Sequence, residues 1–141
     1  MIVLALAALL GLQGAPAPAP VLGPIGRQTL PAKGCAVFLW DNQPKRELVA
    51  MAVADPATIR LRLDGATVDV ARAAEQGPAG FGFSGITEYR GEDVTAVLDM
   101  TVETRRDLSG GAVVPAATLR VERPGRDTLI APVAGLIGCG G

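Results

Sequence analysis

The sequence predicts an all-β protein: a single small antiparallel sandwich or barrel of about seven to eight strands, pinned by one disulfide and preceded by an N-terminal signal-like segment. Three observations predict this class. Short runs in which apolar and polar residues alternate recur along the chain, and Gly, Pro, Asp and Asn separate them. The only two cysteines, Cys35 and Cys139, lie near the two ends of the part that carries these runs.

The first residues resemble an export signal. Residues 1–15 (MIVLALAALLGLQGA) hold an apolar run as long as a signal-peptide core, which is too short to span a bilayer. Neither Lys nor Arg precedes the run, and proline would follow a cut after Ala15, so an uncleaved anchor is the alternative. We therefore expect an exported protein, periplasmic or secreted, that contacts the membrane only if this segment is uncleaved.

The next segment, residues 16–26, is rich in alanine and proline. Alternate prolines at positions 16, 18 and 20 exclude a helix, and such tracts form extended spacers. We expect a linker there. This leaves residues 27–141 as one antiparallel β domain with one hydrophobic core.

The clearest element is a hairpin over residues 58–72. Apolar residues alternate with arginines before Asp64-Gly65, and valines alternate with polar residues after it. Asp-Gly between two alternating runs favours a type I′ turn, because glycine accepts the positive φ that this turn requires. The turn fixes the register, so that apolar residues share one face and Arg60 lies opposite Asp69 on the other.

The remaining elements follow the same pattern. An apolar run at residues 35–40 ends at a turn composition, and a partner strand is expected at residues 47–53. Further strands are expected at residues 94–104, at 117–122 and from 128 onward, and the last ends at Cys139. The one stretch compatible with a helix, residues 70–76, is too short to alter the class.

The two cysteines allow a single intramolecular pairing, and the expected export favours a structural disulfide. The first core strand begins at Cys35 and the last ends at Cys139, so a bridge would join them and protect two strand edges. The chain-entropy account gives such a closure about 4 to 5 kcal/mol. A redox thiol or a metal ligand is the alternative, but the chain has no Cys-x-x-Cys motif and no histidine.

Composition limits the classes of function. The 13 Lys and Arg are interspersed with the 14 Asp and Glu, which predicts no nucleic-acid partner. Residues 80–85 (GFGFSG) match the dinucleotide pattern G-x-G-x-x-G, but a strand and a turn are expected after them where that site needs a helix. We expect no cofactor and no metal, and without histidine a nucleophilic triad lacks its base.

Carboxylates are the remaining candidates for catalysis. A small hydrolase of this kind needs two acids about 5 to 10 Å apart across a cleft. The candidates are Glu88, Glu92, Asp93, Asp99 and Glu103. A solvated strand face is the simpler interpretation, because no sugar-stacking aromatic surface accompanies them. We therefore predict no catalytic residue.

These observations favour a non-catalytic exported envelope protein, a binding or inhibitor-type module that acts on another envelope protein. Its size and expected architecture are similar to those of small envelope proteins that inhibit proteases or lysozyme, and this likeness is of architecture alone. Loops carry binding residues, and the candidates are Trp40, Asp41, Asn42, Phe81 and Phe83. The alternative is a structural accessory domain of an envelope assembly, which would show an exposed apolar patch or a free strand edge.

Overall fold

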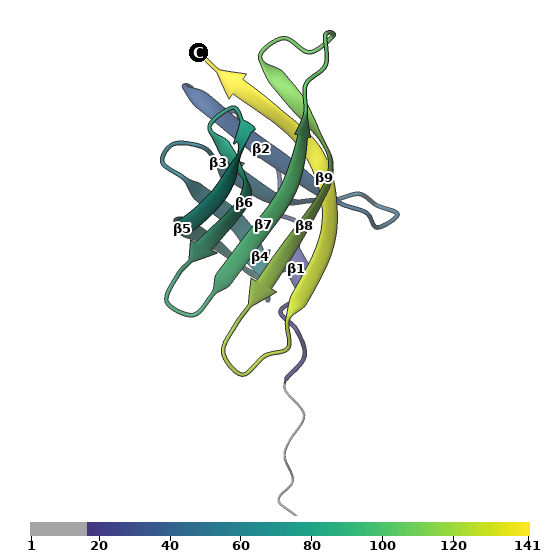
Figure 1. Cartoon of the computed structure of the whole chain (residues 1–141). Coiled ribbons are helices and arrows are strands. Elements are labelled where there is room, and N and C mark those ends of the chain that lie inside the picture. Colours follow the sequence, from purple (N-terminus) through teal and green to yellow (C-terminus); the bar gives the residue numbers. More distant parts are fainter. Residues whose placement is uncertain (1–16) are drawn as a thin grey trace, which may run out of the picture.

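The protein is a β-barrel (Figure 1). The computed structural model describes residues 17–141, so the signal segment expected at residues 1–15 lies outside the described part. Nine strands and no helix form in residues 17–141. The strands are β1 Leu22–Gly23, β2 Gly34–Asp41, β3 Leu48–Val53, β4 Thr58–Leu63, β5 Ala66–Gly80, β6 Phe83–Arg90, β7 Thr95–Glu103, β8 Gly111–Glu122 and β9 Leu129–Gly140.

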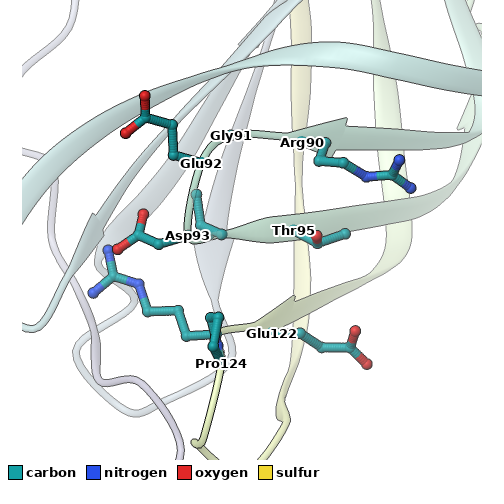
Figure 2. A pocket seen from close by; sticks show the side chains of 9 residues that line it. Arg90, Gly91, Glu92, Asp93, Thr95, Glu122 and Pro124 are labelled. Atoms are coloured by element: carbon teal, nitrogen blue, oxygen red, sulfur yellow. The ribbon is translucent and has the colours of Figure 1, made fainter.

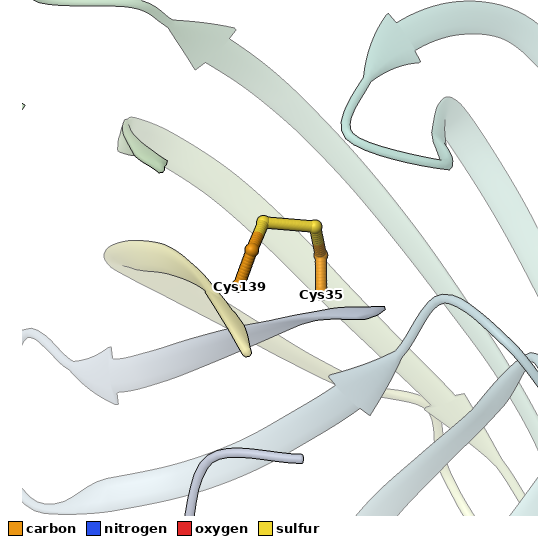
Figure 3. Close-up of a disulfide and its surroundings, with 2 residues drawn as sticks. All are labelled: Cys35 and Cys139. Carbon is orange, nitrogen blue, oxygen red and sulfur yellow. A yellow bond between two sulfur atoms is a disulfide. The ribbon is translucent and has the colours of Figure 1, made fainter. Parts of the chain in front are cut away.

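Strands β2 to β9 form a closed antiparallel barrel, and β1 pairs with one end of β4. Each barrel strand pairs with the next one along the chain, and the pairing of β2 with β9 closes the ring. Because this up-and-down sheet closes on itself, the fold is a barrel and not a sandwich. At the closing seam, Cys35 and Cys139 form the predicted disulfide (Figure 3).

The β4–β5 hairpin has the predicted register. Ile59 lies opposite Val70, and Arg60 lies opposite Asp69. The turn residues Asp64 and Gly65 have φ values of 51° and 84°, as a type I′ turn requires. On the outer face, the guanidinium Nε of Arg60 lies 2.8 Å from Oδ1 of Asp69.

Apolar side chains from all eight barrel strands fill the interior. On β7 the alternation is as predicted, because Ala96, Leu98 and Met100 are buried while Asp99 is exposed. Tyr89, the only tyrosine of the sequence, is 1% exposed in this interior. Burial raises the pKa of its phenol to about 12, and a hydrogen bond with Thr87 opposes that rise.

Part of the segment expected as a linker lies against the barrel. Within residues 16–26, Leu22 and Gly23 form β1, and Pro20 is fully buried. The pairing of β3 with β4 ends at Leu61, so β1 can take the place beside the last residues of β4. Burial of alanine and proline side chains costs no rotamer entropy, which favours the packing of this stretch against the barrel.

Residues 24–33, which we call the strap, then cross the outside of the barrel wall. The N–H of Ile25 donates to the carbonyl of Leu48 on β3 at 2.9 Å, and Oε1 of Gln28 accepts from Arg60 on β4 at 2.8 Å. Leu30 reaches β9, where its side chain lies against Gly138. The strap therefore covers part of the outer face of the closing seam.

Two strands are longer than the sequence pattern predicts. β5 continues to Gly80, so residues 70–76, the stretch compatible with a helix, are part of a strand. β8 begins at Gly111 and not at residue 117. Its register shifts between Val114 and Ala117, and this bulge places a proline inside a strand, where a pattern of strict alternation fails to detect it.

Candidate functional site

The five predicted partner-binding residues lie at two separate places. Trp40 and Asp41 end β2 and Asn42 begins the β2–β3 loop, whereas Phe81 and Phe83 flank the β5–β6 turn at the other end of the barrel. The ring of Phe83 is 7% exposed and belongs to the core, and Phe81 packs against that core. The structure therefore brings together only Trp40, Asp41 and Asn42.

The outer face around Trp40 is apolar across four strands. Residues directly opposite each other on neighbouring strands share one face of the sheet. One row joins Val113, Leu136, Phe38 and Met51, and the next row joins Ala134, Trp40 and Leu48. We call these seven residues the apolar flank; Leu136 within it is 47% exposed.

The opposite side of the barrel has a different character. The outer faces of β4 to β7 carry charged side chains, among them Arg60, Asp69, Glu88 and Asp99. The barrel wall therefore has a charged half, formed by β4 to β7, and an apolar half, formed by β2, β3, β8 and β9, in which β8 also carries the exposed ion pair of Arg120 and Glu122. Within the apolar flank, Leu136 is the exposed residue, Met51 is buried and the other five residues are half-buried.

Trp40 lies between two hollows of the apolar flank. The first, the strap groove, measures about 510 Å³ and is lined by Phe38, Trp40 and Leu48 together with strap residues such as Pro24. The second, the loop hollow, measures about 240 Å³ and lies between Trp40, the β2–β3 loop and β9. Trp40 is half-buried and lines both, so its ring is accessible from two sides.

A third hollow, the edge notch, lies on the other side of the loop. It measures about 340 Å³ and separates residues 20–22 from residues 129–132 of β9. Val21 and Ile130 line it and are 67% and 64% exposed, more than any other large apolar side chain in residues 17–141. Three hollows thus surround the end of β2.

The loop that projects from the barrel beside β9 has a fixed shape (Figure 1). Oδ1 of Asp41 accepts hydrogen bonds from the N–H groups of Gln43 and Glu47, at 3.2 and 3.1 Å. The N–H of Asp41 also donates to the carbonyl of Glu47 at 2.9 Å. Asp41 therefore acts as the internal support of the loop, while residues 42–46 are all exposed.

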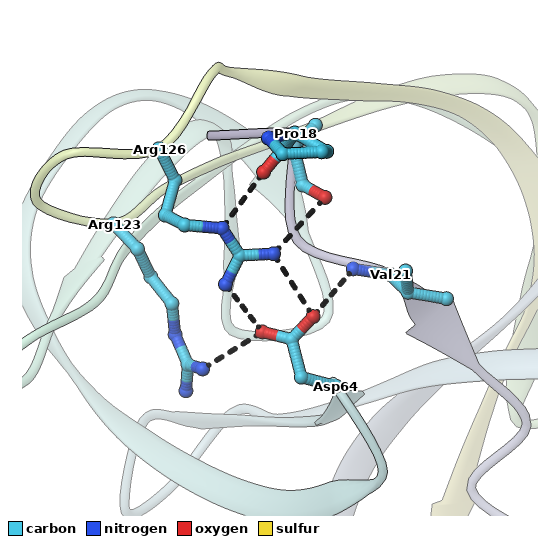
Figure 4. A network of polar contacts seen from close by, with 6 residues as sticks. Pro18, Val21, Asp64, Arg123 and Arg126 are labelled. Atoms are coloured by element: carbon cyan, nitrogen blue, oxygen red, sulfur yellow. Dashed lines mark hydrogen bonds and ion pairs between the residues drawn. The ribbon is translucent and has the colours of Figure 1, made fainter. Parts of the chain in front are cut away.

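An ion cluster holds the N-terminal side of the edge notch (Figure 4). Arg126 binds both carboxylate oxygens of Asp64, at 2.9 and 3.1 Å, and Arg123 adds a contact of 3.1 Å. Arg126 also donates to the carbonyls of Pro18 and Ala19, and Asp64 accepts from the N–H of Val21 at 3.0 Å.

This cluster has an electrostatic consequence. The hydrogen bond from Arg126, with that from the Val21 N–H, lowers the pKa of Asp64 to about 2. Asp64 therefore remains charged over the whole neutral and mildly acid range. In the sequence, Asp64-Gly65 predicts the turn, but it does not predict the distant arginines that bind Asp64.

Of the candidate catalytic acids, Glu92 and Asp93 line one pocket, and Glu88, Asp99 and Glu103 lie outside it. Figure 2 shows the pocket at the β6–β7 turn, where Glu92 and Asp93 point to one side and Glu122 points to the other. Glu88 pairs with Arg90 at 2.8 Å on the outer wall, and Glu103 lies at the other end of β7, 3.8 Å from Arg105. Asp99 is exposed on the outer face.

Two further observations concern the described residues 17–141. No group of three or more His, Cys, Asp and Glu side chains is placed there to hold a metal ion. No helix in that part is long and apolar enough to cross a membrane. Within residues 80–85, which match the dinucleotide pattern, Gly80 ends β5, Phe81 at φ 60° and Gly82 form the turn, and Phe83 begins strand β6.

Comparison of the chain with protein families, curated proteins and solved structures finds no match. The candidate site is therefore defined by its own geometry. It consists of an apolar flank with Trp40 at its centre, a projecting loop and three hollows around the end of β2.

Proposed function

We propose that this domain is a non-catalytic binding module of the cell envelope that contacts another protein through the apolar flank. The observation that carries the proposal is the position of Trp40 between the strap groove and the loop hollow. Tryptophan is one of the side chains most enriched among residues that dominate binding energy. The disulfide is compatible with the oxidising compartment that this location requires.

An inhibitor is one form that such a module takes. Residues 42–46 project from the barrel wall, are all exposed, and are held in shape by Asp41. A projecting loop fixed at its base enters the cleft of a partner with little loss of conformational entropy. This geometry supports a loop that inserts into the partner's cleft while the apolar flank packs against the partner.

A second candidate is a structural accessory domain of an envelope assembly. The exposure of Leu136 and Ile130 favours it, because apolar surface of this kind is normally covered in a permanent complex. The two functions differ in the lifetime of the complex. A regulated binder dissociates and exchanges partners, whereas an accessory domain does not.

Capture from envelope extract tests the proposal. We expect the full chain to retain one stoichiometric protein, and Trp40→Ala to weaken binding of that purified protein by at least about tenfold, as truncation of a central aromatic does. Ile86→Ala is the matched control, since Ile86 is exposed on β6 in the charged half. Equal binding by wild type and Trp40→Ala would refute the proposal, and so would turnover of a substrate without capture.

A further inference from the structure

β9 extends beyond the strand that closes the barrel. Its pairing with β2 ends where Asp41 meets Val133, but β9 itself begins at Leu129. Residues 129–132 pair with β8 on one side, and no strand formed by residues 17–141 pairs with their other side. The ring therefore leaves a short open edge, at the point where the chain leaves β2 for the projecting loop.

The ladder shows which backbone groups face this edge. Successive residues of a strand direct their N–H and C=O groups to opposite sides. The N–H of Cys139 donates to the carbonyl of Gly110, on the β8 side, at 3.2 Å. Odd-numbered residues of β9 thus face β8, and even-numbered residues face β2 and, further down, the open edge.

Ile130 and Pro132 are the even-numbered residues at the open edge. Proline has no N–H and is tolerated in a sheet where its nitrogen faces away from a ladder, which agrees with this assignment. The edge therefore presents the N–H and C=O of Ile130 and the C=O of Pro132. An extended chain or water supplies the hydrogen-bond partners that these groups require.

The side chains around the edge specify what chain would fit. The edge notch beside it is lined by apolar residues of the core rim, among them Leu22, Val49 and Ala131. The one charged residue that lines it is Asp41, whose carboxylate already accepts the loop hydrogen bonds. An incoming strand would direct alternate side chains into this notch, and these would have to be uncharged.

We propose that this edge binds an extended, uncharged segment of the partner protein, which adds to β9 as a strand with an apolar side chain in the edge notch. Strand addition to an exposed edge is an established mode of peptide recognition. The edge lies between residues 20–22 and the start of the projecting loop, which suits a single chain better than the edge of a second barrel. This inference rests on the proposed function and specifies the form of the partner.

A model peptide tests it directly. The probe is a short blocked peptide in which valine and threonine alternate, titrated into the full chain and followed by the amide resonances. We expect saturable shifts at residues 129–131 and around the edge notch, and at least about tenfold slower hydrogen exchange of the Ile130 N–H. The same peptide methylated on alternate backbone nitrogens is the control, and we expect it not to bind.

A pair of variants completes the test. Ile130→Pro removes the N–H donor at the open edge and leaves the hydrogen bonds to β8 in place. We expect it to weaken peptide binding at least about tenfold. Ile130→Val keeps the donor and should bind like the wild type. Equal binding of the methylated peptide, shifts elsewhere on the barrel, or self-association of the chain through this edge would overturn the inference.

Capture of the partner from envelope extract by these variants distinguishes the two proposals. If Trp40→Ala abolishes capture and Ile130→Pro does not, the binding function stands and strand addition is wrong. If neither variant changes capture, the proposed function itself fails. Loss of capture with both variants, with the Ile130→Val protein unaffected, supports both proposals.

Discussion

Cys35 and Cys139 lie directly opposite each other on β2 and β9, with their Cα atoms 4.0 Å apart although 104 residues separate them in the chain. The carbonyl of Cys35 accepts from the N–H of Ala54, the residue after β3, and the N–H of Cys139 donates to the carbonyl of Gly110, the residue before β8. The pair is therefore a non-hydrogen-bonded position of the ladder, where opposing side chains are closest. The disulfide joins the one pair of barrel strands that are not consecutive in the chain.

The double change Cys35→Ala and Cys139→Ala should lower the free energy of unfolding by about 2 to 5 kcal/mol, because the unfolded chain regains the entropy of a long open loop. Urea denaturation of the oxidised protein and the variant measures this difference. Wild type treated with a reductant is the control and should resemble the variant. An unchanged midpoint would mean that the seam holds without sulfur.

Gly135→Ala should destabilise the same seam by about 1 to 3 kcal/mol, as overpacking of a close contact does. A Cβ atom at Gly135 would fall on the carbonyl oxygen of Phe38 across the seam. Gly85→Ala is the matched control in β6, because the nearest atom to its Cβ would be 3.8 Å away. Urea denaturation should separate the two variants, and equal midpoints would contradict the prediction.

Asp64 should contribute to acid stability. Its pKa is lowered to about 2 in the folded protein, against about 3.9 for an unfolded aspartate. Its contribution is therefore complete above about pH 4 and is lost as the pH falls toward 2. Thermal unfolding of wild type and Asp64→Asn across this range measures it: the wild type should lose stability more steeply, and parallel curves would exclude the effect.

Tyr89 gives a matching prediction at high pH. Burial raises the pKa of its phenol to about 12, whereas an unfolded tyrosine ionises near 10. Because the unfolded state loses its proton first, stability should fall as the pH rises from about 10 toward 12. The ultraviolet absorbance of phenolate reports this single tyrosine, and urea-unfolded protein is the control. Ionisation of the folded protein near pH 10 would show that the ring is accessible.

Local chemistry made much of the fold predictable. The Asp64-Gly65 turn fixed the register of the β4–β5 hairpin, and alternation along β7 identified its buried face. The disulfide followed from the positions of two cysteines at the start of the first long strand and the end of the last. The turn and the alternation depend on neighbouring residues, and two cysteines allow only one intramolecular pairing.

The site was less predictable, because it depends on strands that meet only in the closed ring. Trp40, Leu136 and Val113 come from three distant parts of the chain, and only the registers of β2, β8 and β9 place them on one surface. The sequence around Phe83 fits either a binding loop or a glycine-rich strand whose ring packs inward, and the structure shows the second, because β6 begins at Phe83 and its ring lies in the core. The partners of Asp64 are likewise set by tertiary contact and leave no local pattern.

The up-and-down order of the barrel also bears on how the chain reaches this structure. Every pairing but one within the ring joins consecutive strands, so successive hairpins can form with short loop closures. Only the joining of β2 to β9 demands that distant segments find each other. We therefore expect ring closure to be the late event of folding, with the hairpins of the charged half already assembled when the apolar half comes together.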